Sequence, residues 1–321
     1  MHRNSLAEDI STELQKFLSN NIEDYPEGIV LPIDKPYRWT SADVIRKVKY
    51  AACRHFGKKK LKVGHAGTLD PLATGILLVC IGPATRRAEE LQASAKEYVA
   101  GVTFGATTPS YDLEKDIDET YPLDGVSEAS IREMLPSFVG EQDQVAPLFS
   151  AKSVDGVRAY ETARKLFKQG RLEDAEGLLT ANRITVYDLE LLSFLESAED
   201  CSATPIATLG SVRGRGPQDP QEPVGGMERS GRFAEQSSEV KDRSSRINVA
   251  DISEYNLPTA MIRVGCSKGT YIRALARDFG EALGSGAFLS SLRRTKNGGF
   301  SIEDAISIDD AMALLGRPEQ D

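Results

Sequence analysis

The chain carries, at residues 63–75, the run Val63-Gly64-His65-Ala66-Gly67-Thr68-Leu69-Asp70-Pro71-Leu72-Ala73-Thr74-Gly75. Flexible glycines on both sides of a single carboxylate are typical of a site rather than of a core. The apolar run 76–82 follows at once and predicts a buried strand. Asp70 would therefore lie on a tight loop that enters this strand. These residues alone leave Asp70 as a nucleophile, a carboxylate that caps the loop, or a metal ligand.

The composition is that of a globular protein. The chain has 321 residues, of which 40% are hydrophobic and 27% charged, enough for one large domain or two modest ones. No apolar run approaches the roughly 20 residues of a membrane helix. The start lacks the order of a signal peptide, so we expect a cytoplasmic protein without membrane contact. The four cysteines are far apart and form no CxxC pair, which argues against disulfides and a zinc cluster.

The net charge of −9 does not indicate a nucleic-acid partner, but the charge is uneven. A local basic face on an acidic protein can still bind phosphate, although a lysine run can also be only a solvated loop. The basic clusters are Arg54, His55, Lys58, Lys59, Lys60 and Lys62 before the glycine-rich run, Arg86 and Arg87 after the strand, and Arg293, Arg294 and Lys296 near the end.

Strand and helix patterns alternate without a regular βαβ rhythm. This predicts an α+β fold with a mixed, mostly antiparallel sheet flanked by helices. We expect Ser41 to cap the first long helix. The expected strands are 28–36, 76–82, 96–105, 183–195, 259–266 and 287–296, and the expected helices are 42–56, 84–93, 127–138, 267–283 and 308–315.

One domain, 28–315, accounts for these elements. It follows an N-terminal helical extension at 1–27 and precedes a short tail at 316–321. Residues 197–256 are rich in Ser, Gly, Pro, Glu and Arg, and we expect a disordered insertion within the domain. Because a strand pattern resumes at 259–266, the strands on either side of the insertion could pair as a hairpin with a very long loop.

At Gly64–Gly75 the chain resembles the TruB family of tRNA pseudouridine-55 synthases. Four further boxes resemble that family in its order over residues 28–300: Leu31–Pro36, Lys96–Tyr98, Cys266–Arg273 and Ser291–Arg294. The resemblance implies the pseudouridine synthase catalytic fold and an isomerase that converts the T-loop uridine of tRNA to pseudouridine. It also implies that no metal and no organic cofactor take part. Many bacterial relatives carry a C-terminal PUA-like domain beyond the catalytic domain, whereas this sequence stops at Asp321. We therefore expect the minimal form without that domain, and a monomer.

The resemblance places Asp70 at the aspartate that this chemistry needs. The reaction breaks the C1′–N1 bond, turns the uracil and rejoins it through C5. A carboxylate can add to C6 or capture C1′, and a glycal route is a third possibility; the sequence leaves the three open. Arg273 matches the family arginine that pairs with this aspartate and favours its charged form. From sequence alone, Arg273 could equally be a surface helix residue.

The uridine of a folded T-loop has to be flipped out of its stack to react. Tyr98 matches the family tyrosine on which the flipped base stacks. Tyr271 matches a second pocket tyrosine, which would position the Asp70–Arg273 pair or the base. Leu292 matches an apolar pocket wall. The alternative for all three is ordinary packing.

The remaining predicted contacts are with RNA. His65 matches a family histidine that pushes into the RNA loop and would stack rather than act as an acid or base. The other predicted contacts are Gly64 and Gly67 for close backbone approach, Lys35 beside the active site, and Lys59 and Arg293 for phosphates.

Three alternatives remain beside this reading. The first is the same chemistry on another RNA, because motifs fix the reaction more than the substrate. The second is a non-catalytic tRNA-binding or folding module, against which Asp70 speaks. The third is a metal-dependent RNA hydrolase. Against it, the sequence near the loop has no second carboxylate or histidine at ligand spacing.

Overall fold

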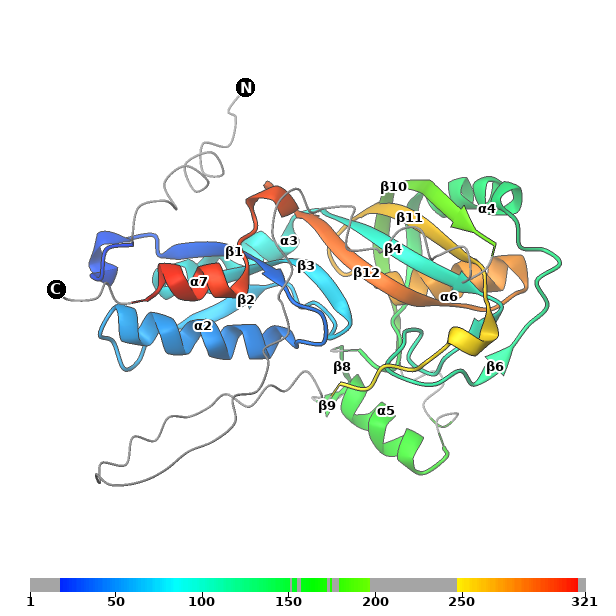
Figure 1. Ribbon diagram of the computed structural model, residues 1–321, viewed down its shortest axis with the longest axis horizontal. Coiled ribbons are helices and arrows are strands. Elements are labelled where there is room, and N and C mark those ends of the chain that lie inside the picture. Colours follow the sequence, from blue (N-terminus) through cyan, green and yellow to red (C-terminus); the bar gives the residue numbers. More distant parts are fainter. Residues whose placement is uncertain are drawn as a thin grey trace, which may run out of the picture.

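A nine-stranded sheet runs through the molecule (Figure 1). The computed structural model describes residues 18–150, 152–154, 157–171, 174, 179–196 and 247–316. The strands of this sheet are β1 (Ile29–Lys35), β2 (Val63–Ala66), β3 (Ala73–Ile81), β4 (Lys96–Phe104), β7 (Gly140–Val145), β10 (Ala181–Leu195), β11 (Thr259–Cys266), β12 (Ala287–Asn297) and β13 (Phe300–Ser301). Two short pairs lie outside it: β5 (Ala106–Thr107) with β6 (Glu119–Thr120), and β8 (Ser153–Val154) with β9 (Val157–Arg158).

The strand order is β1-β3-β12-β4-β11-β10-β7, with β2 beside β3 and β13 beside β12. Every pair is antiparallel except β3 with β12. The predicted α+β class with a mixed, mostly antiparallel sheet is therefore confirmed. The order also puts β1 and β12 on either side of the start of β3, directly after the Asp70 loop.

Helices cover the sheet at both ends. They are α2 (Ser41–His55), α3 (Ala88–Ala93), α4 (Glu128–Met134), α5 (Ala159–Lys168), α6 (Ile272–Leu283) and α7 (Ile308–Leu314). In Figure 1, α2 and α7 lie at one end with β1 and β3, while α4 and α6 lie at the other end with β10 and β11. One hydrophobic core joins both ends, with Val44 and Val48 of α2 and Leu275 and Phe279 of α6 all buried in it. Within the described ranges no helix is long and apolar enough to cross a membrane.

Two helix starts differ from the prediction. Thr40, not Ser41, caps α2: its hydroxyl accepts from the Asp43 amide, and the Asp43 carboxylate accepts from the Thr40 amide. Ser41 is instead the first residue of the helix and bonds to another part of the chain. The helix expected over 84–93 is divided into a 3₁₀ helix, Gly82–Arg87, and the short α3; Pro83 lies in the first turn of the 3₁₀ helix, where proline is accepted.

The strands that flank the long insertion pair as expected. β10 and β11 are antiparallel neighbours, with Val186 opposite Cys266 and Leu195 opposite Thr259. Residues 197–246 of the predicted insertion lie outside the described residues, but 247–256 pack against the domain. The Ala250 amide donates to the Leu113 carbonyl at 2.8 Å, and Ala250 is buried. Of the predicted extension and tail, 1–17 and 317–321 also lie outside the described residues, and the remainder includes a 3₁₀ turn, Ile22–Asp24.

Gly75 allows β3 and β12 to meet, and its replacement tests the packing beside the Asp70 loop. Its φ is +98°, and an added Cβ would lie 2.2 Å from the Arg294 carbonyl oxygen. We expect Gly75→Ala to lower the free energy of unfolding by about 2–4 kcal/mol, measured by urea denaturation. Gly64→Ala is the matched control, because its Cβ would meet nothing closer than the Thr85 methyl at 4.0 Å. Equal stability of the two variants would contradict this packing.

Candidate active site

Asp70 lies on the loop between β2 and β3, and hydrogen bonds from distant elements hold the backbone of this loop. The buried Ser41 hydroxyl accepts from the Leu69 amide at 2.9 Å and donates to the Leu69 carbonyl at 3.0 Å. The Asn297 side-chain amide donates to the Ala66 carbonyl at 3.3 Å. The loop that carries Asp70 is therefore fixed to α2 on one side and to the end of β12 on the other.

Two buried cations complete this hold on the loop. Lys35 is 0% exposed, and its Nζ donates to the carbonyls of Pro71 (3.1 Å), Pro36 (2.9 Å) and Trp39 (2.6 Å). Arg294 is 1% exposed, and it donates to the carbonyls of Gly67 (3.2 Å) and Ile76 (2.7 Å). Buried cations are costly unless they are paired, and here carbonyl oxygens of the loop and its neighbours supply partners.

A third buried cation pairs with Asp70 itself. Arg273 Nε lies 2.9 Å from Asp70 Oδ2, and the side chains are 5% and 38% exposed, respectively. Arg273 also donates to the carbonyls of Ser110 (3.0 Å) and Phe149 (2.9 Å). The arginine is thus fixed from several directions, while the carboxylate that it holds stays open to solvent. The sequence-based expectation that Arg273 and Asp70 lie together agrees with this geometry.

The structure adds Asp112, which sequence reasoning missed. Asp112 Oδ2 lies 3.4 Å from Arg273 Nη1, and its Oδ1 accepts from the Ser110 hydroxyl (2.6 Å) and the Glu114 amide (3.0 Å). Burial raises the pKa of Asp112 above its usual value, and the opposing effect of Arg273 is smaller. Asp112 belongs to an acidic, turn-rich stretch in which nothing in the sequence distinguishes one carboxylate from another.

Leu292 and Tyr98 lie on neighbouring strands near the loop. Leu292 lines a small pocket together with Asp70, Asp112 and Arg273. Tyr98, on β4, lies opposite Arg294 on β12 and is buried, and burial raises the pKa of its hydroxyl. Tyr98 does not line that pocket. The structure therefore brings Leu292 into contact with the same space as Asp70 and places Tyr98 beside it.

Tyr271 lies two residues before Arg273, at the N-cap of α6. Its backbone amide donates to Gln144 Oε1 at 2.9 Å, and its carbonyl accepts from Gln144 Nε2 at 3.2 Å. Its side chain packs against a small buried cluster, Ala146, Ala159 and Leu179. The structure thus places the ring of Tyr271 toward α5 rather than in the pocket with Asp70.

His65, Gly64 and Gly67 lie on the approach to the loop. His65, on β2, lies opposite Val79, and its Nδ1 is buried without a hydrogen-bond partner. Burial and the nearby Arg294 lower the pKa of His65, which keeps the ring neutral at neutral pH. Gly67 has a φ of +92°, in the region that favours glycine, whereas Gly64 has open space where a side chain would lie.

The predicted phosphate contacts divide into three cases. Lys59 is exposed in the loop that follows the C-terminal end of α2. The Ser41–Leu69 contact lies at the other end of this helix, so Lys59 is about 20 Å from the Asp70 loop along the helix axis. Arg293 is paired with Asp34 at 2.8 Å. The expectation that Arg294 binds phosphate is wrong, because Arg294 is buried and bonded to carbonyls of the protein.

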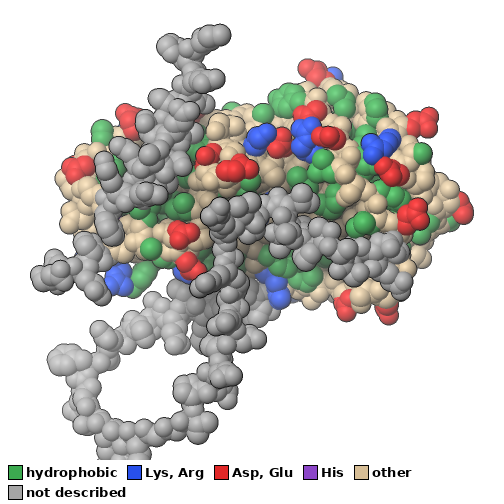
Figure 2. All heavy atoms as spheres, turned by 45° about the horizontal axis from the view of Figure 1, so that its top comes forward, with side chains coloured by type: hydrophobic (Ala, Val, Ile, Leu, Met, Phe, Trp, Pro, Cys, Tyr) green, Lys and Arg blue, Asp and Glu red, His purple; other side chains and the backbone are tan. Residues whose placement is uncertain are grey.

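On the face drawn in Figure 2, acidic and basic side chains are interspersed. No group of three or more His, Cys, Asp or Glu that could hold a metal occurs in the described part of the chain.

The pH dependence of stability tests the burial of Lys35. Burial lowers the pKa of Lys35 from 10.5 to about 7, although Asp70 and Asp34 oppose the shift. Between these values the unfolded chain binds a proton that the folded chain does not, so this group increases stability as pH rises. We therefore expect the stability advantage of the wild type over Lys35→Met to grow from pH 7 to pH 9, measured by denaturant unfolding. An advantage that is constant or shrinks with pH would contradict this assignment.

Comparisons with known proteins identify the family of this chain. The family model described as "TruB family pseudouridylate synthase (N terminal domain)" matches residues 54–204, and that described as "tRNA pseudouridylate synthase B C-terminal domain" matches 273–319. Curated proteins named tRNA pseudouridine synthase B are 41% identical in Phocaeicola vulgatus and 42% identical in Bacteroides thetaiotaomicron. Each alignment covers 92% of this chain, with 97% and 96% of the relative, respectively.

A solved structure shares the fold. The crystal structure of a Cbf5-Nop10-Gar1 complex contains a chain that matches with a TM-score of 0.52 and 25% identity. The match covers 91% of this chain but 56% of that one, so the chain spans little more than half of its structural neighbour.

Proposed function

Because the chain belongs to the TruB family and is an isomerase that forms pseudouridine in tRNA, we propose that Asp70 is its nucleophile and that its target is the T-loop uridine, position 55. The observation that carries the proposal is the 2.9 Å ion pair of Asp70 with Arg273. Arg273 is buried and fixed, so the cation that orients the Asp70 carboxylate is already in place before RNA binds. The exposed side of the carboxylate is then free to meet a base or a ribose.

The chemistry that follows is an isomerisation in which no atoms are lost. The C1′–N1 bond breaks and a C1′–C5 bond forms. C5 loses its proton, and N1, released from the ribose, gains one. Asp70 acts as a carboxylate nucleophile, at C6 or at C1′, or it begins a glycal route by assisting loss of the C2′ proton. All three routes use the same carboxylate, so replacement of Asp70 tests whether this carboxylate is required without choosing among them.

The pocket beside Asp70 supports a flipped base in this proposal. Leu292 forms its apolar wall. Tyr98 is buried beside this pocket on β4, opposite Arg294, and would offer its ring and hydroxyl to the base from there. Tyr271 acts from a distance, because it begins the first turn of α6 and Arg273 is the second residue of that helix. Lys35 acts on the backbone by holding the Pro71 carbonyl.

RNA approaches over β2 and the loop that follows it. Neutral His65 is suited to stack within the T-loop, while Gly64 and Gly67 leave the backbone uncovered. Lys59 reaches a phosphate farther along the T-arm, and Arg293 exchanges Asp34 for a phosphate, which would make binding salt-dependent. We also propose that the enzyme acts as a monomer in the cytoplasm without a metal ion, since Arg273 and Leu292, from distant segments of this chain, already line the pocket with Asp70.

Replacement of Asp70 by Asn tests the nucleophile. We expect pseudouridine formation at position 55 of an unmodified tRNA to fall by at least about 10³-fold, because the amide cannot form the covalent bond. The dissociation constant for tRNA should change by less than about threefold, since the charge removed is not a phosphate contact. Asp309→Asn, at an exposed position on α7, is the matched control and should keep full activity.

The same assay tests the substrate. Wild-type enzyme should modify an isolated T-arm stem-loop as well as whole tRNA. Product at a different uridine, or only in another RNA, would show that this uridine or RNA is the substrate instead of the T-loop uridine. Isomerisation by Asp70→Asn at the wild-type rate would instead overturn the nucleophile.

A further inference from the structure

Tyr111 adopts a backbone conformation that is unusual for a tyrosine. Its φ is +55°, and it is one of three non-glycine residues in the described ranges with a positive φ. This conformation is unfavourable for a bulky residue and persists only where surrounding contacts enforce it. Tyr111 stands between Ser110 and Asp112, which both bind Arg273.

Hydrogen bonds fix the turn around Tyr111. The Tyr111 amide donates to the Thr108 carbonyl at 3.0 Å, and its own carbonyl accepts from the Leu289 amide at 3.0 Å. The Thr108 hydroxyl donates to the Asp112 carbonyl at 2.7 Å. The resulting turn directs the Ser110 carbonyl and the Asp112 carboxylate toward Arg273, and the Tyr111 side chain toward a separate cavity.

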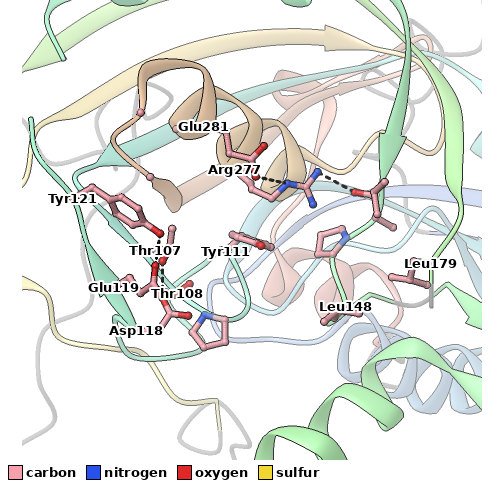
Figure 3. Close-up of a pocket in the computed structure, with 17 residues that line it drawn as sticks. Thr107, Thr108, Tyr111, Asp118, Glu119, Tyr121, Leu148, Leu179, Arg277 and Glu281 are labelled. Atoms are coloured by element: carbon pink, nitrogen blue, oxygen red, sulfur yellow. Dashed lines mark hydrogen bonds and ion pairs between the residues drawn. The ribbon is translucent and has the colours of Figure 1, made fainter. Parts of the chain in front are cut away.

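That cavity has a volume of about 850 Å³ and lies between α6, the segment 107–121 and residues 145–148 (Figure 3). In it Arg277 lies against Tyr111, with the guanidinium carbon 5.5 Å from the ring centroid. Arg277 is fixed in turn, because its Nη2 donates to Asp278 Oδ1 at 2.6 Å and to the Val145 carbonyl at 3.3 Å. A cation held over an aromatic face is attracted by the negative face of the ring, so Arg277 and Tyr111 hold each other in place.

Arg277 is also one helical turn after Arg273 on α6. Residues four apart lie on the same face of a helix. α6 therefore presents two arginines to the turn 108–112: Arg273 bonds to Ser110 and Asp112, and Arg277 holds the Tyr111 ring between them. The contact between Arg277 and Tyr111 therefore sets the positions of the Ser110 carbonyl and the Asp112 carboxylate, which bind Arg273.

We propose that Tyr111 and Arg277 are positioning residues for pseudouridine formation, which orient Arg273 through Ser110 and Asp112 and thereby orient Asp70. The proposal rests on the proposed role of Asp70. Neither residue lines the pocket beside Asp70, so both act through Arg273.

The variants separate the ring from the backbone. Tyr111→Asn removes the ring, but asparagine accepts a positive φ, so the turn itself is not penalised. Tyr111→Phe keeps the ring beside the Arg277 guanidinium and loses the hydroxyl together with its interaction with Arg277. Arg277→Ala removes the stacked cation without altering the turn. Tyr255→Asn, at an exposed position outside both pockets, is the matched control.

The assay is single-turnover formation of pseudouridine with full-length protein and unmodified tRNA, alongside the dissociation constant. We expect Tyr111→Asn and Arg277→Ala each to slow the reaction about 10- to 100-fold, because misplacement of reacting groups by an ångström has effects of this size. Tyr111→Phe and Tyr255→Asn should stay within about threefold of the wild-type rate, and tRNA affinity should be unchanged. The double variant should be no slower than the slower single variant, because both residues act on one turn.

Several results would overturn the proposal. These are a wild-type rate in Tyr111→Asn, a loss shared equally by Tyr111→Phe, a loss of rate that tracks loss of tRNA affinity, or rate losses that multiply in the double variant. Thermal unfolding confirms that each variant is folded at the assay temperature; if Tyr111→Asn is not, Arg277→Ala decides. Asp70→Asn is run in parallel. An active Asp70→Asn refutes the nucleophile, whereas an inactive Asp70→Asn beside a fully active Tyr111→Asn and Arg277→Ala refutes only the positioning pair.

Discussion

Lys35, Arg273 and Arg294 bring three basic side chains into the interior around a single loop. A buried cation is tolerated only where oxygen atoms replace its hydration, and here each of the three has one of those oxygens on the loop that carries Asp70. The cost of burying the cations and the position of the loop are therefore coupled. If the loop moves, a buried cation loses a partner, which costs several kcal/mol for a charged group. This coupling holds the loop that carries Asp70 in place although the loop has no regular secondary structure.

The topology of the sheet makes this convergence possible. β1 and β12 flank the start of β3, so Lys35 at the end of β1 and Arg294 on β12 reach the loop from opposite sides. α6 contributes Arg273 from the other half of the molecule. A site assembled in this way is pre-organised, with charge and orientation set by the fold before the substrate arrives. The exposed carboxylate of Asp70 is the part left for the substrate to meet.

Much of this architecture could be predicted from the sequence, because alternating and continuous apolar runs mark strands irrespective of their partners. The Asp70–Arg273 pairing came from family resemblance. The rest depends on contacts between distant segments. Thr40 and Ser41 can both cap a helix; Thr40 takes the cap through its bonds with Asp43, and the contact of Ser41 with the distant Leu69 is visible only in the fold. A charged residue such as Arg294 is normally at the surface, so its burial follows from carbonyls that another strand supplies. Asp112 resembles its acidic neighbours until its distance to the guanidinium is known.

The central claim is that a rigidly held backbone places Asp70, and the single-turnover rate of Ser41→Ala tests it most directly. This substitution removes the two hydrogen bonds to Leu69 but alters no charge and none of the predicted RNA contacts. The account predicts a rate about 10-fold lower or more, with an unchanged dissociation constant for tRNA, in protein that is folded at the assay temperature. A wild-type rate in the folded variant would contradict it.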